Sequence, residues 1–256
     1  MIYFIGAGPG DPELITIKGK RLIEEADVIV YAGSLVNPQV LVGAKPGAKI
    51  YNSATMTLDE VISVLCQGEK EGKRVVRVHT GDPSLYGAIR EQMAELDRLR
   101  IAYEVIPGVS SFLAAAAAIK REYTMPGISQ TVILTRMEGR TPVPKRECIP
   151  ELAAHQATMV IFLSVGQIAL LCEQLQQGGY EANTPAAVVY KASWEEETIV
   201  CGTLRDLAEK VKAAGIRKTA LVMVGEFLGD VFETSKLYDP EFGHEYRTAK
   251  NGGHEN

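Results

Sequence analysis

Closely spaced metal-binding or disulfide-forming residues are missing from this 256-residue sequence. It has four cysteines and four histidines, and no two cysteines form a CxxC pair. Structural zinc sites need Cys and His ligands at short spacings, and small secreted domains rely on regular sets of paired cysteines. We therefore expect no metal site, and we expect the thiols to stay reduced, as they do in the cytoplasm.

A surplus of positive charge and a long hydrophobic run are also missing. The sequence has 27 Lys+Arg against 32 Asp+Glu, which gives a net charge of −5. Nucleic acid and anionic membranes attract surplus Lys and Arg, so we expect neither as a partner. The apolar run at residues 112–119 is far shorter than the roughly 20 residues that cross a bilayer. No basic leader precedes the N-terminal apolar residues, so we expect a soluble, cytoplasmic protein.

Hydrophobic residues make up 46% of the chain and charged residues 23%, a balance typical of globular proteins. In the first half, short β-branched runs alternate with stripes of apolar residues at helical spacing, which favours a mainly parallel sheet covered on both faces. Strands are predicted at residues 2–5, 27–31, 75–78 and 103–106, and helices at 14–26, 58–71 and 89–99.

The second half has a different pattern, beginning with an alanine-rich helix at residues 110–120. Further strands are predicted at residues 131–134, 159–163, 186–190 and 220–224, and helices at 167–176 and 204–213. We therefore predict an N-terminal α/β domain at residues 1–112, a C-terminal α/β domain at 113–238 and a flexible tail at 239–256.

Three glycine-containing segments follow predicted strands, at residues 6–12, 79–87 and 106–111. The carboxyl ends of parallel strands meet at one edge of a sheet, so these segments are predicted to line one crevice. Asp11 stands where the dinucleotide-binding fingerprint GxGxxG needs a glycine, and no GK[ST] phosphate loop is present. Asp11 can instead cap a helix, so tight turns without a ligand remain an alternative interpretation.

Together the segments GAGPGDPELIT, RVHTGDPSLYG and VIPGVSSFLAAAA resemble the tetrapyrrole methylase family, whose members use S-adenosylmethionine in cobalamin, sirohaem and diphthamide synthesis. The resemblance covers nearly the whole chain. Within the family, four segments look like the precorrin-4 C-11-methyltransferase branch: YAGSLV (31–36), SQTVILTRMEGRTPVP (129–144), VVYKASWEEETIV (188–200) and GIRKTALVMVG (215–225). The uroporphyrinogen III methyltransferases carry Tyr-Asp after the second strand, whereas this chain has Tyr31-Ala32.

The resemblance implies an α/β fold of two domains, with a mainly parallel N-terminal sheet, a mixed C-terminal sheet and an active-site cleft between them. It also implies a homodimer that methylates C-11 of precorrin-4 or cobalt-precorrin-4, giving the corresponding precorrin-5 in cobalamin biosynthesis. Carried over by position, its contacts with S-adenosyl-L-methionine fall on Pro9, Thr80, Gly81, Asp82, Leu85, Ser110, Ser111, Leu163 and Ala192.

The implied substrate is a tetrapyrrole with several carboxylates, which guanidinium groups pair with well. Candidate substrate-binding residues are His79, Tyr86, Arg136, Glu138 and Arg140. Further candidate cations are Arg90, Arg121, Lys191, Arg217 and Lys218. No side chain is assigned as a catalytic acid or base, because methyl transfer from a sulfonium depends mainly on alignment. Trp194 is expected to be a packing residue.

Two other functions remain open at this point. The chain could be a sibling methyltransferase of the same family that acts on another tetrapyrrole or on diphthamide. It could also be a nicotinamide-dependent oxidoreductase or a non-catalytic nucleotide-binding module, although Asp11 disfavours a pyrophosphate at that turn.

Overall fold

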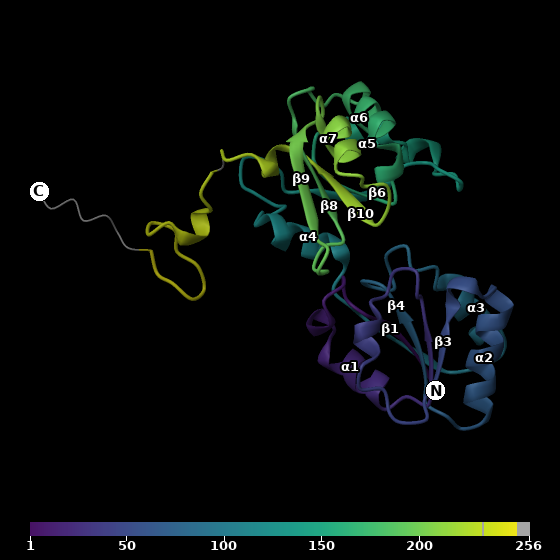
Figure 1. Cartoon of the computed structure of the whole chain (residues 1–256). Coiled ribbons are helices and arrows are strands. Elements are labelled where there is room, and N and C mark those ends of the chain that lie inside the picture. Colours follow the sequence, from purple (N-terminus) through teal and green to yellow (C-terminus); the bar gives the residue numbers. More distant parts are fainter. Residues whose placement is uncertain (232, 250–256) are drawn as a thin grey trace, which may run out of the picture. The chain divides into compact units, whose positions relative to one another are not determined.

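The computed structural model describes residues 1–231 and 233–249, which belong to two α/β units (Figure 1). The first unit comprises Met1–Ile119 and Val189–Thr198, and the second comprises Lys120–Val188 and the chain from Ile199 onward. The domain boundary predicted after residue 112 falls inside helix α4 (Ser111–Ile119), which belongs to the first unit.

A five-stranded parallel sheet forms the centre of the first unit. Its strand order is β3-β2-β4-β1-β5, and each recorded neighbouring pair runs parallel. The strands span Ile2–Gly6 (β1), Val28–Tyr31 (β2), Lys49–Asn52 (β3), Val75–His79 (β4) and Tyr103–Ile106 (β5). The mainly parallel N-terminal sheet expected from the alternating pattern is therefore confirmed.

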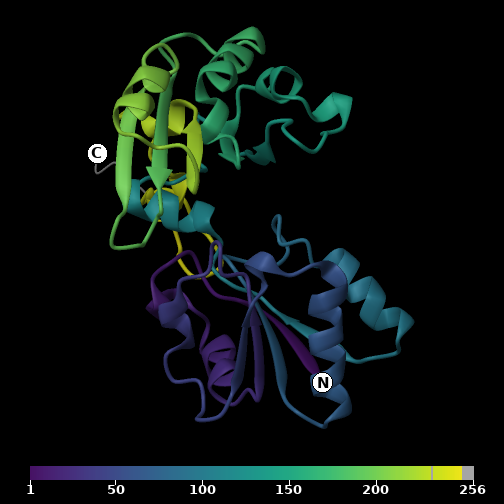
Figure 2. The ribbon, with the colours of Figure 1, turned by 45° about the vertical axis from the view of Figure 1, so that its right-hand side comes forward.

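Helices cover both faces of this sheet, with α1 on one side and α2 and α3 on the other (Figure 2). They span Ile17–Glu24 (α1), Leu58–Lys70 (α2) and Arg90–Arg98 (α3). Successive side chains of a strand point to opposite faces. Phe4 accordingly packs with α2 and α3, and the next residue, Ile5, packs with α1.

Helix α2 begins where its sequence provides a strong start signal. Thr57 accepts a hydrogen bond from the Glu60 amide, and the Glu60 carboxylate accepts one from the Thr57 amide. This reciprocal pair satisfies two amides that the first turn would otherwise leave unpaired. Asp11 acts similarly at the first glycine-containing segment, because it accepts from the Glu13 amide and caps the short 3₁₀ turn Pro12–Leu14.

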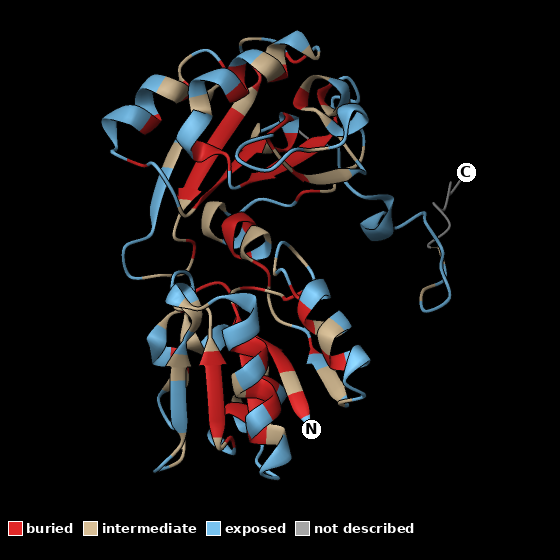
Figure 3. Ribbon diagram, turned by 90° about the vertical axis from the view of Figure 1, so that its right-hand side faces the viewer, coloured by how far each residue is buried: buried red, intermediate tan, exposed pale blue. Residues whose placement is uncertain are grey.

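The second unit contains a mixed five-stranded sheet of order β6-β7-β10-β8-β9. Strands β6 and β7 run parallel, whereas β10 runs antiparallel to β7, which confirms the predicted mixed sheet. The strands span Val132–Arg136 (β6), Thr158–Phe162 (β7), Pro185–Tyr190 (β8), Thr198–Thr203 (β9) and Ala220–Val224 (β10). Strands β7 and β10 are buried along their whole length (Figure 3).

Helix α6 of the second unit packs against both α5 and α7. The three helices span Ile149–Ala153 (α5), Ile168–Gln177 (α6) and Leu207–Ala213 (α7). The described residues form six further 3₁₀ turns, of which Pro38–Leu41 and Ser53–Thr55 belong to the first unit. Lys145–Glu147, Val165–Gln167, Glu226–Leu228 and Lys236–Tyr238 belong to the second. No helix within the described part of the chain is long and apolar enough to cross a membrane.

Part of the predicted tail has a defined local structure. The Arg247 guanidinium donates to the carbonyls of Leu237, Asp239 and Phe242 at 2.7, 2.6 and 3.0 Å. His244 and Arg247 also exchange backbone hydrogen bonds. Residues 250–256 of the predicted tail lie outside the described residues.

Candidate functional site

The three glycine-containing segments meet at the carboxyl edge of the parallel sheet, as predicted. Gly81 donates its amide to Gly8 at 2.8 Å, and Gly8 donates back to Gly81 at 3.3 Å. Ala7 donates to the carbonyl of His79 at 2.8 Å, which extends the pairing of β1 and β4 into the loops. The third segment joins through the Gly108 amide, which donates to Asp82 at 2.8 Å.

The backbones of these segments approach too closely to admit side chains at the contact. A Cβ atom on Gly6 would lie 2.6 Å from the Gly81 carbonyl oxygen, and one on Gly108 would lie 2.2 Å from the same oxygen. Gly8 and Gly81 also adopt φ values of +79° and +58°, which glycine accepts without steric cost. Where the three segments meet, backbone atoms therefore lie against one another without side chains between them.

Asp82 connects two of the segments through its carboxylate. One oxygen accepts from the Ser84 amide and hydroxyl, and the other accepts from the Gly108 amide. Burial raises the pKa of the Asp82 carboxyl, but these hydrogen bonds outweigh burial and hold the pKa below its usual range. The side chain is therefore ionised at neutral pH and engaged by the protein's own loops.

Eight of the nine residues predicted to bind the cofactor belong to the first unit. Pro9, Gly81 and Ser110 are buried there, while Thr80, Asp82, Leu85 and Ser111 are partly exposed. Ala192 is buried within the segment Val189–Thr198. The ninth, Leu163, belongs to the second unit, follows β7, has a φ of +54° and is 70% exposed. Their roles stay predictions.

His79 and Arg77 lie inside the first unit rather than on its surface. His79 is 3% exposed and stacks on Phe4, and its Nε2 has no hydrogen-bond partner among the described residues. Burial, with a smaller effect of the Arg77 charge, lowers the pKa of His79 to about 3. The imidazole is therefore neutral at physiological pH, and substrate contact would require it to become accessible.

The Arg77 guanidinium uses its donors within the core. It donates to the Gln92 side chain at 3.1 Å and to the carbonyls of Val30 and Val78 at 3.3 and 3.4 Å. Burial lowers the pKa of Arg77 to about 10, so the group stays charged. Arg77 thus places a positive charge under the carboxyl edge of the sheet without facing solvent.

The remaining predicted substrate-binding residues are divided between the units. Tyr86 is 45% exposed in the first unit and has a φ of +54°. In the second unit, the Arg136 guanidinium donates to the carbonyls of Met137, Thr141 and Pro142 at 3.1, 3.1 and 2.8 Å. Arg136 therefore holds the loop after β6, on which Glu138 and Arg140 are exposed.

The other candidate cations separate into engaged and exposed groups. Arg121 pairs with Asp230 at 2.7 Å, and Lys191 pairs with Glu196 at 3.2 Å. Four of the candidate cations are exposed and take part in none of the ion pairs of the described residues: Arg90, Arg140, Arg217 and Lys218. These four are better placed than the paired ones to meet an anionic ligand.

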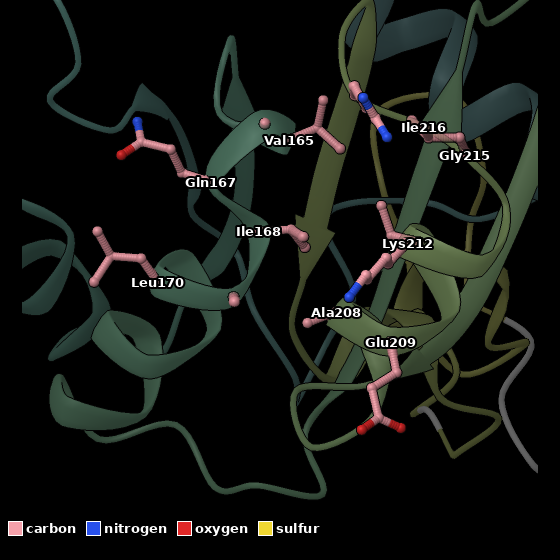
Figure 4. Close-up of a pocket in the computed structure, with 13 residues that line it drawn as sticks. Val165, Gln167, Ile168, Leu170, Ala208, Glu209, Lys212, Gly215 and Ile216 are labelled. Carbon is pink, nitrogen blue, oxygen red and sulfur yellow. The ribbon is translucent and has the colours of Figure 1, made fainter.

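A cavity of about 770 Å³ lies within the second unit, between α6 and α7 (Figure 4). Ile168 and Leu170 of α6 line it, together with Ala208 and Lys212 of α7 and Arg217 beyond. It contains none of the predicted cofactor-binding residues. Its walls are largely apolar, with two cations among the lining residues.

The first glycine-containing segment is held by side chains whose role the sequence did not indicate, and Trp194, expected only to pack, is one of them. The Trp194 indole N–H donates to the Pro9 carbonyl at 2.9 Å, and the Asp11 amide donates to the Ser193 hydroxyl at 3.1 Å. Asn37 donates to the Gly10 carbonyl at 2.9 Å. Trp194 and Ser193 lie more than 180 residues from their partners in sequence. No local pattern could have revealed these contacts.

Comparisons with known proteins agree with the fold. The family model for tetrapyrrole (corrin/porphyrin) methylases matches residues 1–208. A cobalt-precorrin-4 C(11)-methyltransferase of Methanocaldococcus jannaschii is 59% identical, over 97% of this chain and 96% of its own length. A precorrin-4 C(11)-methyltransferase of Pseudomonas aeruginosa is 48% identical, over 97% of this chain and 99% of its own length.

Solved structures are similar as well. The crystal structure of a cobalt precorrin-4 methyltransferase has a TM-score of 0.87 and 48% identity, covering 89% of this chain and 95% of that one. A uroporphyrin-III C-methyltransferase of Thermus thermophilus, complexed with S-adenosylhomocysteine, has a TM-score of 0.72 and 30% identity, covering 89% and 98%. The chain belongs to the tetrapyrrole (corrin/porphyrin) methylase family.

Proposed function

We propose that this chain transfers a methyl group from S-adenosyl-L-methionine to C-11 of precorrin-4 or cobalt-precorrin-4, giving the corresponding precorrin-5 in cobalamin biosynthesis. The observation that carries the proposal is the 59% identity to a cobalt-precorrin-4 C(11)-methyltransferase over nearly the full length of both chains. The three hydrogen-bonded loops at the carboxyl edge of the first sheet also support the proposal, because they form an edge at which the methyl donor can bind.

The residues at this edge fit the proposed cofactor. Glycines keep side chains out of this edge, so that a nucleoside can be recognised there without long side chains. The ionised Asp82 carboxylate places negative charge at the same edge, the sign that suits a sulfonium. We assign cofactor contacts to Pro9, Thr80, Gly81, Asp82, Leu85, Ser110, Ser111, Leu163 and Ala192.

The chemistry requires alignment more than acid–base catalysis. When bound, S-adenosylmethionine supplies an electrophilic methyl group carried on a positively charged sulfur. The rest of the donor leaves as S-adenosylhomocysteine, a leaving group that does not need a proton. The protein then contributes mainly by holding the donor and the acceptor carbon in line, which can lower the barrier by roughly 7–11 kcal/mol. Backbone bonds between Gly8 and Gly81 make the donor edge rigid for this purpose.

Exposed cations provide the proposed contacts to the substrate. The tetrapyrrole carries several carboxylates, and Arg140 and Arg217 are exposed guanidinium groups suited to pair with them. Arg136 acts through the loop it holds, because three of its hydrogen bonds go to that loop's carbonyls. Glu138 and Tyr86 are proposed neighbours of the macrocycle.

The metal state of the substrate needs its own test. A cobalt-precorrin-4 enzyme of Priestia megaterium is 47% identical and the precorrin-4 enzyme of Pseudomonas aeruginosa 48% identical, so identity does not separate the two substrates. The purified protein should be incubated with carbon-13-methyl-labelled S-adenosylmethionine and each macrocycle in parallel. We expect one labelled methyl at C-11, located by NMR.

Other results of the same experiment would overturn the proposal. A label at another carbon would indicate a sibling methyltransferase, and tight nicotinamide dinucleotide binding without S-adenosylhomocysteine binding would indicate an oxidoreductase or a binding module. We further propose a cytoplasmic homodimer with no nucleic-acid or membrane partner, in keeping with the net charge of −5. Light scattering after size-exclusion chromatography should give twice the mass of 27.8 kDa.

A further inference from the structure

The segment Val189–Thr198 makes a set of contacts with the first glycine-containing segment that packing alone does not require. The Trp194 side chain donates its only polar hydrogen to the Pro9 carbonyl at 2.9 Å, and the Ser193 hydroxyl accepts from the Asp11 amide at 3.1 Å. These bonds occupy backbone groups on both sides of Gly10. Residues 9–11 are thereby held by a part of the chain remote in sequence.

Gly10 and Trp194 fit each other closely. A Cβ atom on Gly10 would lie 2.0 Å from Cδ1 and 2.2 Å from Nε1 of Trp194, and the three nearest atoms all belong to that indole. The φ of Gly10 is not among the positive values, so its backbone conformation would accept alanine. The indole therefore explains why this position is glycine.

The turn that presents the indole is held in a costly conformation. Lys191 and Ser193 have φ values of +46° and +69°, which non-glycine residues rarely adopt. The Ser193 amide donates to Glu197 at 2.7 Å, and the Lys191 ammonium lies 4.8 Å from the Trp194 ring. Ala192, a proposed cofactor contact, lies between the two unusual residues. Such local strain is typical of functional segments.

We propose that Trp194 is a positioning residue for the methyl donor, acting by fixing the Pro9–Gly10 backbone beside Ala192. The inference rests on the proposed function, because it assumes that Pro9 and Ala192 contact S-adenosylmethionine. Trp194 itself holds the loop and does not take part in the reaction. Its removal therefore weakens donor binding and leaves the affinity for the tetrapyrrole unchanged.

A double-mutant cycle with Gly10 tests this directly, with S-adenosylhomocysteine affinity measured by calorimetry. Trp194→Phe keeps the ring but loses the donor, and should bind about 5-fold more weakly. Gly10→Ala should bind at least about 10-fold more weakly, because the new methyl displaces the indole. In a Trp194→Ala background, Gly10→Ala should add less than about a 2-fold further loss.

A spectroscopic signal accompanies the cycle, because Trp194 is the only tryptophan in the sequence. Gly10→Ala should shift its fluorescence to the red and increase quenching by acrylamide. Steady-state kinetics of Trp194→Phe should show a raised KM for S-adenosylmethionine and an unchanged KM for the tetrapyrrole. Tyr103→Phe, which loses one hydrogen bond to Asp97 elsewhere in the same unit, is the matched control and should bind normally.

The outcomes distinguish the two proposals. If the wild-type protein fails to bind S-adenosylhomocysteine, the proposed function itself fails. If the wild type binds it but Trp194→Phe and Gly10→Ala bind equally well, the positioning role is refuted. Additive losses in the double mutant would also refute it, because they would show that Gly10 and Trp194 act independently.

Discussion

The strand-end loops of the two units are held in different ways. In the first unit, the loops after β1 and β4 exchange backbone hydrogen bonds, and the Asp82 carboxylate ties in the loop after β5. In the second unit, the loop after β6 is held by the Arg136 side chain. A Cβ atom on Gly139 of that loop would meet nothing closer than 3.9 Å.

The difference matches two kinds of recognition. An edge built from backbone presents fixed groups at fixed positions and tolerates few changes, which suits an invariant donor such as S-adenosylmethionine. A loop that exposes Arg140 presents a guanidinium side chain, which suits the carboxylates of a tetrapyrrole. The predictions below test whether this contrast between backbone and side-chain recognition is real.

The largest effect is expected from adding one methyl group at the crowded edge. A Cβ atom at Gly108 would lie 2.2 Å from the Gly81 carbonyl oxygen, so Gly108→Ala should destabilise the protein by about 3 kcal/mol and weaken S-adenosylhomocysteine binding. Gly139→Ala in the second unit is the matched control and should change stability little. Equal urea midpoints of unfolding for the two variants would contradict the difference in crowding between the loops of the two units.

Replacing the carboxylate that ties the loops should have the next largest effect. In Asp82→Asn, the new side-chain NH₂ group faces a backbone N–H, either that of Gly108 or that of Ser84, and two donors cannot form a hydrogen bond. We therefore expect the free energy of unfolding to fall by about 2 kcal/mol. Asp206→Asn is the control, because Asp206 of the second unit accepts from the Thr203 amide and pairs with Lys210, and its side chain is 42% exposed. An Asp206 variant that loses as much stability as the Asp82 variant would contradict the account.

The buried His79 should make stability depend on pH. Its pKa of about 3 in the folded state lies below its ordinary value of 6.5, so the unfolded state binds more protons between these values. The stability that this group contributes declines as the pH falls through 6.5, by roughly 1 kcal/mol between pH 7 and 5.5. In urea unfolding, His79→Asn should reduce the dependence of the free energy of unfolding on pH. If that dependence were unchanged, the pH effect would not come from a buried His79 imidazole.

The smallest predicted effect concerns the exposed cations. Arg140→Ala and Arg217→Ala should each raise the KM for the tetrapyrrole about 5-fold, because a charge-assisted hydrogen bond is lost. Stability and S-adenosylhomocysteine affinity should stay unchanged, since both side chains are exposed. Lys49→Ala, an exposed change on edge strand β3, is the control. If the KM for S-adenosylmethionine rose instead, these cations would bind the methyl donor and not the tetrapyrrole, which would contradict the prediction.

Most buried elements were predictable from the sequence, because burial imposes a clear hydrophobic pattern. Strands β1, β4 and β7 are read directly from apolar runs, and α2 from its apolar stripe. Strands β3 and β9 and helix α5 were missed. The two strands lie at sheet edges with mostly exposed side chains, and α5 is only five residues long, so neither gives a periodic signal.

The site was predictable to the extent that it depends on strand ends. The convergence of the three segments follows from the rule for parallel sheets and is confirmed. The directions of individual side chains were not predictable in the same way. His79 turns into the core, Arg136 faces its own loop, and Trp194 reaches Pro9 across 185 residues. These placements depend on tertiary contacts, which sequence spacing does not encode.

The most direct test of the account is an amide NMR titration with S-adenosylhomocysteine. We predict that the largest shifts occur at the amides of the non-proline residues in 8–11, 80–85 and 108–111, with Leu163 as the expected responder in the second unit. Residues 137–144 and the α6–α7 cavity should respond weakly. Shifts concentrated around Ile168, Lys212 and Arg217, with none at the first three segments, would contradict the assignment of the donor site to the parallel sheet.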